Sequence, residues 1–302
     1  MPRKLSLALP AFLAFVAPNV FAQTQLVLLG TGTPQQTPER SGPTSAVVYK
    51  GAAYIFDAGP GVVRRASAAS TQRGISALGP SQLRRVFLTH LHSDHTLGLP
   101  DLIFSPWVVG RREPLEIYGP KGTREMVEHI EAAWRQDIDI RVHGLEHAND
   151  TGYKTIVHEV EPGFIYRDGA VTITALSVHH GSWPQAYGYR VQTPERVIVI
   201  SGDCAPSPSL IEACNGCDIL LHEVYPLAGQ EQGGDAWIKY LHEFHTSTEE
   251  LAELATKAHP KLLVLYHQVY ASGAAETPAV LLDEMHRAYK GSVVSGRDLD
   301  VY

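Results

Sequence analysis

The most constraining feature of this sequence is a cluster of imidazole and carboxylate side chains directly after a short apolar segment. Residues 85–88, Arg-Val-Phe-Leu, have the pattern of a buried strand. Two residues apart on an extended backbone, His90 and His92 can point toward one place. Asp94 and His95 follow as the chain turns, so they can reach a second place. The spacing therefore predicts two neighbouring metal ions, each with nitrogen and oxygen ligands and a position left for water.

Other candidate ligands lie in turns or at the carboxyl ends of later apolar segments, the edge where α/β folds gather ligands. Residues 171–178 alternate like a strand and are followed by two histidines, His179 and His180. Neighbouring strand residues face opposite sides, so only one of the two can enter a common site. Asp203 follows the apolar segment 196–200, and His267 ends the segment 262–267.

The His-x-His-x-Asp-His segment, with Thr89 before it and Leu-Gly-Leu-Pro-Asp-Leu at 97–102 after it, resembles the metallo-β-lactamase superfamily. Its flanks look most like the branch that contains ribonuclease Z and the secreted bacterial arylsulfatases. The resemblance covers residues 26–267 and implies an α/β fold, a four-layer αββα sandwich of two mixed β-sheets flanked by helices. It favours His180 over His179. It also implies the ligands of each ion. The first ion would be bound by His90, His92 and His180, and the second by Asp94, His95 and His267. Asp203 would bridge the two ions.

The resemblance also implies catalytic and supporting roles. Asp94 would orient or deprotonate the attacking water, and His245, in the segment Glu-Phe-His-Thr-Ser-Thr, would protonate the leaving group. From the residues alone, His245 could equally be a helix-entry histidine, since Ser247 is a good helix cap. Asp57 could be a helix cap or a support for the histidine loop, and the family favours the support. Glu223 matches a family His-Glu motif that orients His245.

The expected cofactor is a pair of divalent metal ions. Zinc suits the first, histidine-rich set of ligands, whereas the second set could also accept manganese or iron.

The first 22 residues have the pattern of a secretory signal peptide. A basic start at Arg3 and Lys4 precedes a mostly apolar run, and small residues before Gln23 fit a cleavage site. The run is too short for a comfortable membrane span. We therefore expect one hydrolase domain over residues 23–302, located in the periplasm or secreted, with no membrane contact after cleavage.

The overall charge and one sequence interval shape the expected substrate. The net charge of −7 argues against a nucleic-acid surface. Ribonuclease Z carries a long tRNA-grasping arm between its third histidine and bridging aspartate, but here His180 and Asp203 lie only 23 positions apart. We expect a small anionic ester and no nucleic-acid partner, and most of all an arylsulfatase. A phosphodiesterase is the first alternative, then a lactonase; the non-enzymatic alternative is a periplasmic metal-binding protein. A homodimer is compatible with the sequence.

The chain has three cysteines. Cys214 and Cys217 form a Cys-x-x-Cys pair that could close a small disulfide outside the cytoplasm, away from catalysis. Cys204 follows Asp203 and is expected to point away from the site if the strand continues.

Overall fold

The computed structural model describes residues 24–35, 37–270 and 278–302. The predicted signal peptide, residues 1–22, lies outside these ranges, and export stays a prediction. Within the described ranges, no helix is both long enough and apolar enough to cross a membrane.

The first sheet contains six strands in chain order. The first three strands are antiparallel, and the rest continue in parallel. Lys50 and Gly51 both have positive φ values, 47° and 80°, so they form the tight turn that suits a two-residue hairpin. The strands are β1 (Thr24–Gly30), β2 (Thr44–Tyr49), β3 (Ala52–Phe56), β4 (Arg85–Phe87), β5 (Leu115–Gly119) and β6 (Thr155–Glu159).

The second sheet contains seven strands in the order β13-β12-β11-β10-β9-β8-β7. The strands from β7 to β10 are antiparallel, and those from β10 to β13 are parallel. The strands are β7 (Ile165–Asp168), β8 (Val171–Val178), β9 (Ala186–Gln192), β10 (Val197–Ile200), β11 (Ile219–Val224), β12 (Leu262–Gln268) and β13 (Val293–Ser295).

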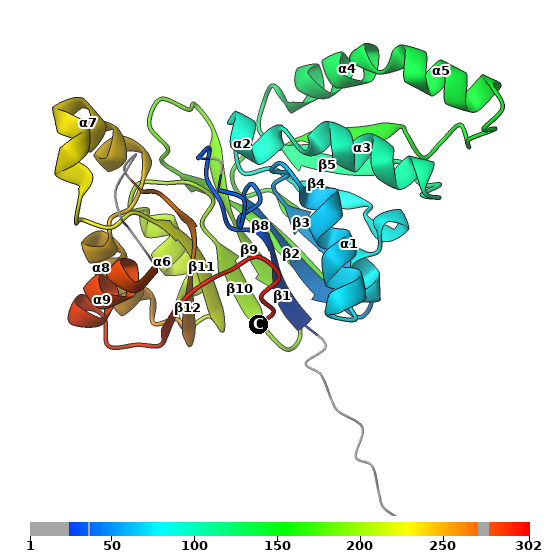
Figure 1. The fold of residues 1–302 in the computed structure, drawn as a ribbon. Helices are drawn as coiled ribbons and strands as arrows, with labels where there is room; N and C mark the ends of the chain where they lie inside the picture. The colour runs from blue at the N-terminus through cyan, green and yellow to red at the C-terminus, as the bar shows by residue number, and fades with distance from the viewer. Residues whose placement is uncertain (1–23, 36, 271–277) are drawn as a thin grey trace, which may run out of the picture.

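Helices cover the outer faces of both sheets, which confirms the predicted αββα sandwich (Figure 1). One apolar core lies between the sheets, and one lies under the helices on each side. Beside the first sheet are α1 (Val62–Gln72), α2 (Ser93–Thr96), α3 (Leu99–Val108), α4 (Thr123–Ala133) and α5 (Arg135–His143). Beside the second are α6 (Pro208–Cys214), α7 (Gly234–Phe244), α8 (Thr248–Ala258) and α9 (Pro278–Ala288).

Two local features differ from, or add to, what the sequence suggested. The polar segment 137–155 reads as irregular, yet its first part belongs to α5, a helix on which no side chain is fully buried. Cys214 and Cys217 form a disulfide with an S–S distance of 2.03 Å, and Cys204 is free and buried.

A buried arginine ties the first sheet to its helices. Arg111 is fully buried and donates hydrogen bonds to four backbone carbonyls, those of Leu83, Leu102, Ile103 and Gly152, at 2.6–3.2 Å. Burial lowers the pKa of Arg111 to about 10, so the side chain stays charged at neutral pH. The carbonyl dipoles take the place of a carboxylate partner.

Replacing this arginine should destabilise the fold. We expect Arg111→Met to lower the free energy of unfolding by about 3 kcal/mol or more, because each buried acceptor left without a donor costs about 1–3 kcal/mol. Arg112→Met is the matched control, since Arg112 is exposed and carries the same charge. Chemical denaturation of both variants measures the difference, and equal losses would show that the Arg111 network contributes nothing specific.

Candidate metal centre

All seven predicted ligands meet at one edge of the two sheets, where β4, β8, β10 and β12 end. Six of them are at least nine-tenths buried, and His92 is partly exposed. They form two groups whose ligand atoms lie within 4.8 Å of one another inside each group: His90, His92 and His180; and Asp94, His95, Asp203 and His267. His179, the alternative to His180, is exposed and points to Glu243 instead.

In the first group, three nitrogens face a common point. His92 Nδ1 lies 2.9 Å from His90 Nε2 and 3.1 Å from His180 Nε2. The Nδ1 of His180 donates to the Phe244 carbonyl at 2.8 Å, which leaves its Nε2 with a lone pair. Thr89 Oγ1 donates to Asp57 and can therefore accept from His90 Nδ1, which leaves His90 Nε2 with a lone pair as well. Burial lowers the pKa of all three imidazoles, that of His180 to about 3. Neutral imidazoles are the form that binds metals.

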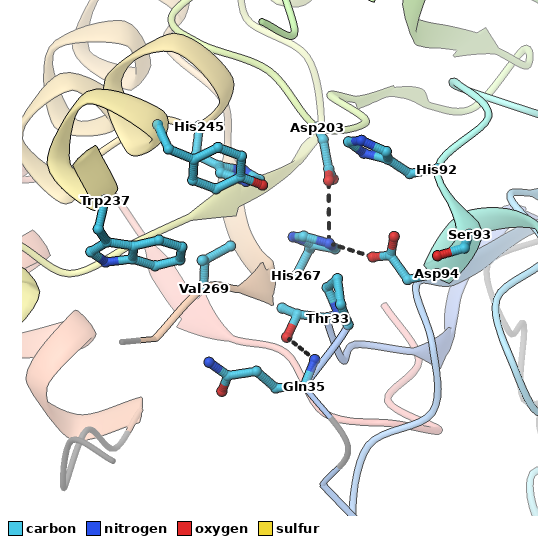
Figure 2. A pocket seen from close by; sticks show the side chains of 12 residues that line it. Thr33, Gln35, His92, Ser93, Asp94, Asp203, Trp237, His245, His267 and Val269 are labelled. Atoms are coloured by element: carbon cyan, nitrogen blue, oxygen red, sulfur yellow. Dashed lines mark hydrogen bonds and ion pairs between the residues drawn. The ribbon is translucent and has the colours of Figure 1, made fainter. Parts of the chain in front are cut away.

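In the second group, two carboxylates and two imidazoles share the interior. His267 Nε2 lies 3.2 Å from both Asp203 Oδ2 and Asp94 Oδ2 (Figure 2). Asp203 Oδ2 also lies 3.2 Å from His95 Nε2. The other oxygen of Asp203, Oδ1, is buried and has no hydrogen-bond partner. Burial opposes ionisation of Asp203, but His267 and His95 hold its pKa well below the ordinary value.

This second group fits a cation. His95 donates from Nδ1 to Asp57 Oδ2 at 2.8 Å, so its Nε2 faces Asp203 and Asp94. Burial opposes a charge on His95, yet Asp203, Asp57 and Asp94 raise its pKa well above the usual value. The carboxylates therefore favour positive charge among them. A divalent ion would supply that charge and accept the free oxygen of Asp203.

The ligand-bearing segment around His267 has an unusual backbone conformation. In β12, Tyr266 and Gln268 pair with the neighbouring residues Glu223 and Val224 of β11. His267 lies between them without a partner and forms a bulge. Its φ is 40°, in the left-handed region. Bulges re-aim side chains beside functional sites, and this one turns His267 toward Asp94 and Asp203.

Asp57 has the contacts expected of a support for the histidine loop. Its φ is 62°, and its carboxylate accepts hydrogen bonds from Thr89 N, Thr89 Oγ1 and His95 Nδ1 at 2.8–3.1 Å. It is no helix cap, because the residue before α1 is Gly61.

His245 lies at the side of the second group, between Glu223 and Tyr240. Its Nδ1 is 3.3 Å from Glu223 Oε2, although the two atoms are not aligned for a hydrogen bond, and its Nε2 is 3.2 Å from Tyr240 Oη. Glu223 Oε1 accepts from Thr246 N at 2.9 Å, and Ser247 caps α8 in a capping box with Glu250. Burial and Asp203 raise the pKa of Glu223 well above its usual value. The capped helix and Glu223 together hold the His245 backbone in place.

Comparison with known proteins establishes the family. The model of the beta-lactamase superfamily domain matches residues 53–268. The chain is 34% identical over 277 residues to Ribonuclease Z of Mycobacterium bovis (strain BCG / Pasteur 1173P2), covering 90% of this chain and 94% of the relative. The chain belongs to the metallo-β-lactamase superfamily, in its ribonuclease Z-like branch. Ribonuclease Z of Mycobacterium sp. (strain KMS) is 36% identical over 251 residues, with 80% and 83% of the two chains covered.

Solved structures of this family share the fold. The short form of human tRNase Z has a TM-score of 0.66 and 22% identity, covering 92% of this chain and 98% of that chain. The metallo-beta-lactamase fold protein YhfI from Bacillus subtilis has a TM-score of 0.69 and 18% identity, covering 92% and 99%.

These relatives overturn the expected substrate. An arylsulfatase acting on a small anionic ester, with no nucleic-acid partner, is wrong, because the relatives of similar length are named for action on RNA. The short interval between His180 and Asp203 did not predict the substrate class correctly. The alignment with the Mycobacterium bovis relative spans 277 residues, and the aligned 90% of this chain is about 272 residues. The aligned part of that relative therefore contains no insertion of the size of an arm.

The sequence analysis missed the side chains that surround the ligands on one side. The indole nitrogen of Trp183 lies 2.8 Å from His92 Nε2. Trp237 and Tyr240, both on α7, line a cavity of about 340 Å³ with Asp94, His245 and His267. A signal for α7 was present, since its apolar residues recur at helical spacing: Trp237, Tyr240, Leu241 and Phe244.

Gly181 connects α7 to the first ligand group. Gly181 N donates to the Glu243 carbonyl at 2.9 Å, and its φ is 51°. A Cβ atom there would overlap the Phe244 ring. The backbone carbonyl of Phe244 accepts from His180 Nδ1 and so orients that ligand. The absence of a side chain therefore lets the end of α7 reach the ligand loop.

Adding a methyl group at this position should disturb both helix and site. We expect Gly181→Ala to lower the free energy of unfolding by at least about 1 kcal/mol more than Gly163→Ala, because overpacking alone typically costs 1–3 kcal/mol. Gly163 is the matched control, since it also has a positive φ, 84°, but open space around it. Denaturation curves measure both variants. Equal destabilisation would mean that the Phe244 contact yields without cost.

Proposed function

We propose that this chain is a metal-dependent phosphodiesterase that hydrolyses RNA and uses two divalent ions, zinc in the histidine group and zinc, manganese or iron in the carboxylate group. The observation that carries the proposal is the pair of buried ligand groups with His245 beside them. The relatives named Ribonuclease Z support the choice of RNA.

The cavities beside the site suit a substrate that continues on both sides of the reacting bond. A second cavity, of about 620 Å³, shares five lining residues with the first and runs along the loop after β1. Arg40 lines it, and its hydrogen bonds within the described ranges go to neutral groups, on Thr31, Gly296 and Gln268, at 3.0–3.4 Å. Its charge is available to a phosphate. The shared residues are Thr33, Pro34, Gln35, Ser93 and Asp94.

In the proposed mechanism, the phosphodiester and one water give a phosphate monoester and an alcohol. Divalent ions held by the seven ligands would polarise the phosphoryl oxygens and make a water nucleophilic near neutral pH. Asp94 orients that water and accepts a proton from it. His245 donates a proton to the departing oxygen, while Glu223 and the capped start of α8 keep the imidazole in place.

A substrate panel tests this function. The purified protein, loaded with zinc or manganese, should hydrolyse a short RNA and a dinucleotide but not an aryl sulfate. Asp203→Ala should lose at least about 100-fold in rate, since loss of even the groups that orient metal ligands costs about 10–100-fold. His129→Ala, which changes an exposed histidine of α4, is the control and should keep full activity. Absence of RNA and dinucleotide hydrolysis by the loaded protein would refute the proposal.

The role of His245 predicts a dependence on the leaving group. His245→Ala should slow hydrolysis of a dinucleotide by about 10²–10⁴-fold, the usual contribution of general acid catalysis. It should slow a nitrophenyl phosphodiester far less, because nitrophenolate departs without a proton. Elemental analysis should find unchanged metal content, since His245 is not among the seven ligands. Equal losses for both substrates would show that His245 is not the proton donor.

A further inference from the structure

Helix α7 presents a row of aromatic rings that the proposed mechanism does not use. Trp237 and Tyr240 are stacked with ring centroids 5.3 Å apart and an interplanar angle of 21°. Tyr240 and Phe244 are stacked at 4.6 Å and 24°. Leu241 is buried beside Tyr225 and fixes the inner face of the helix.

The rings are held in place before any substrate arrives. Phe244 packs on Gly181, where a side chain would collide with it. Trp237 packs on Gly233 in the same way and donates its indole N–H to the buried Gln230 Oε1 at 2.8 Å. A surface that is already ordered loses little entropy on binding, which favours affinity.

The same rings form a wall of the cavity. Trp237 and Tyr240 line it together with His245 and His267, and Figure 2 shows Trp237 on the opposite side of His267 from Asp94. Both rings are only partly buried. One side of each ring packs against the small apolar cluster of Tyr225, Leu241 and Val269. Packing therefore uses only part of each ring, and the rest faces the cavity.

The wall lies on the side of the proposed proton donor. Tyr240 Oη is 3.2 Å from His245 Nε2, the ring nitrogen that is directed away from Glu223. A group that departs next to His245 therefore departs next to the Tyr240 ring, with Trp237 stacked beyond it. Aromatic side chains bind nucleobases by stacking, largely irrespective of base identity.

We propose that Trp237 and Tyr240 form a stacking subsite for the nucleobase on the leaving-group side of the scissile phosphodiester. The inference rests on the proposed function, because it takes the phosphodiester and the role of His245 from it. The subsite makes the enzyme prefer a base on the leaving side without selecting which base.

The kinetic test uses three dinucleotides: one intact, one without the base on the leaving side and one without the base on the other side. The product that carries the phosphate identifies the leaving side. The wild-type enzyme should show a higher KM only when the leaving-side base is absent. Trp237→Leu should raise KM for the intact dinucleotide by about 5- to 150-fold, the range of stacking energies per base, and leave KM for the leaving-side abasic analogue unchanged. Trp237→Phe is the matched control, keeps a ring, and should retain most of the affinity.

A binding test separates this inference from the proposed function. Calorimetry on the metal-loaded protein compares adenosine 5′- and 3′-monophosphate with ribose 5- and 3-phosphate. The nucleotide whose phosphate is on the oxygen that departs should bind more tightly than the matching ribose phosphate, and Trp237→Leu should remove the difference. If the binding difference holds but no dinucleotide is cleaved, the subsite stands and the proposed function fails. If dinucleotides are cleaved but Trp237→Leu weakens both ligands equally, or neither, the subsite is refuted and the function stands.

Discussion

The structure depends on the burial of three carboxylates, Asp57, Asp94 and Asp203, around the single imidazole of His95. Carboxylates buried this closely are stable only when positive charge lies among them. His95 and His267 supply part of this positive charge, and one oxygen of Asp203 has no hydrogen-bond partner. The convergence of the strand ends, the bulge in β12 and the network of Asp57 all serve to hold these groups together.

Part of the ligand set could be predicted from a strong local signal, whereas the choice of His180 over His179 and the division of the ligands between two ions rested on the family resemblance. His90, His92, Asp94 and His95 follow one apolar strand within six residues, and strand periodicity fixes how the first two point. Asp203 and His180 follow other apolar strands. The structure brings all seven residues together, while their ligation of metal stays a prediction.

Other features could not be predicted, for physical reasons. The bulge that aims His267 arises from pairing between β11 and β12, which the sequence of β12 alone does not contain. Helix α7 begins at the second of two glycines, Gly234, and the sequence shows its aromatic residues only as an apolar stripe at helical spacing. The substrate was misjudged because a net charge of −7 is a sum over the whole chain. An RNA strand would contact one face only, where metal ions, if bound, and side chains such as Arg40 would set the local potential.

The left-handed backbone at Asp57 and His267 has a consequence for how this protein can change. Most residues other than glycine pay about 1–2 kcal/mol in that conformation, although asparagine and aspartate adopt it more readily because their short side chains hydrogen bond locally. Replacing either residue by glycine would relieve this strain. It would also leave the buried donors of Thr89 and His95 without Asp57, or Asp94 and Asp203 without His267, and each unpaired group costs about 1–3 kcal/mol, which outweighs the gain. Directed evolution scored on heat resistance alone would therefore tend to keep both residues, even without any selection for product.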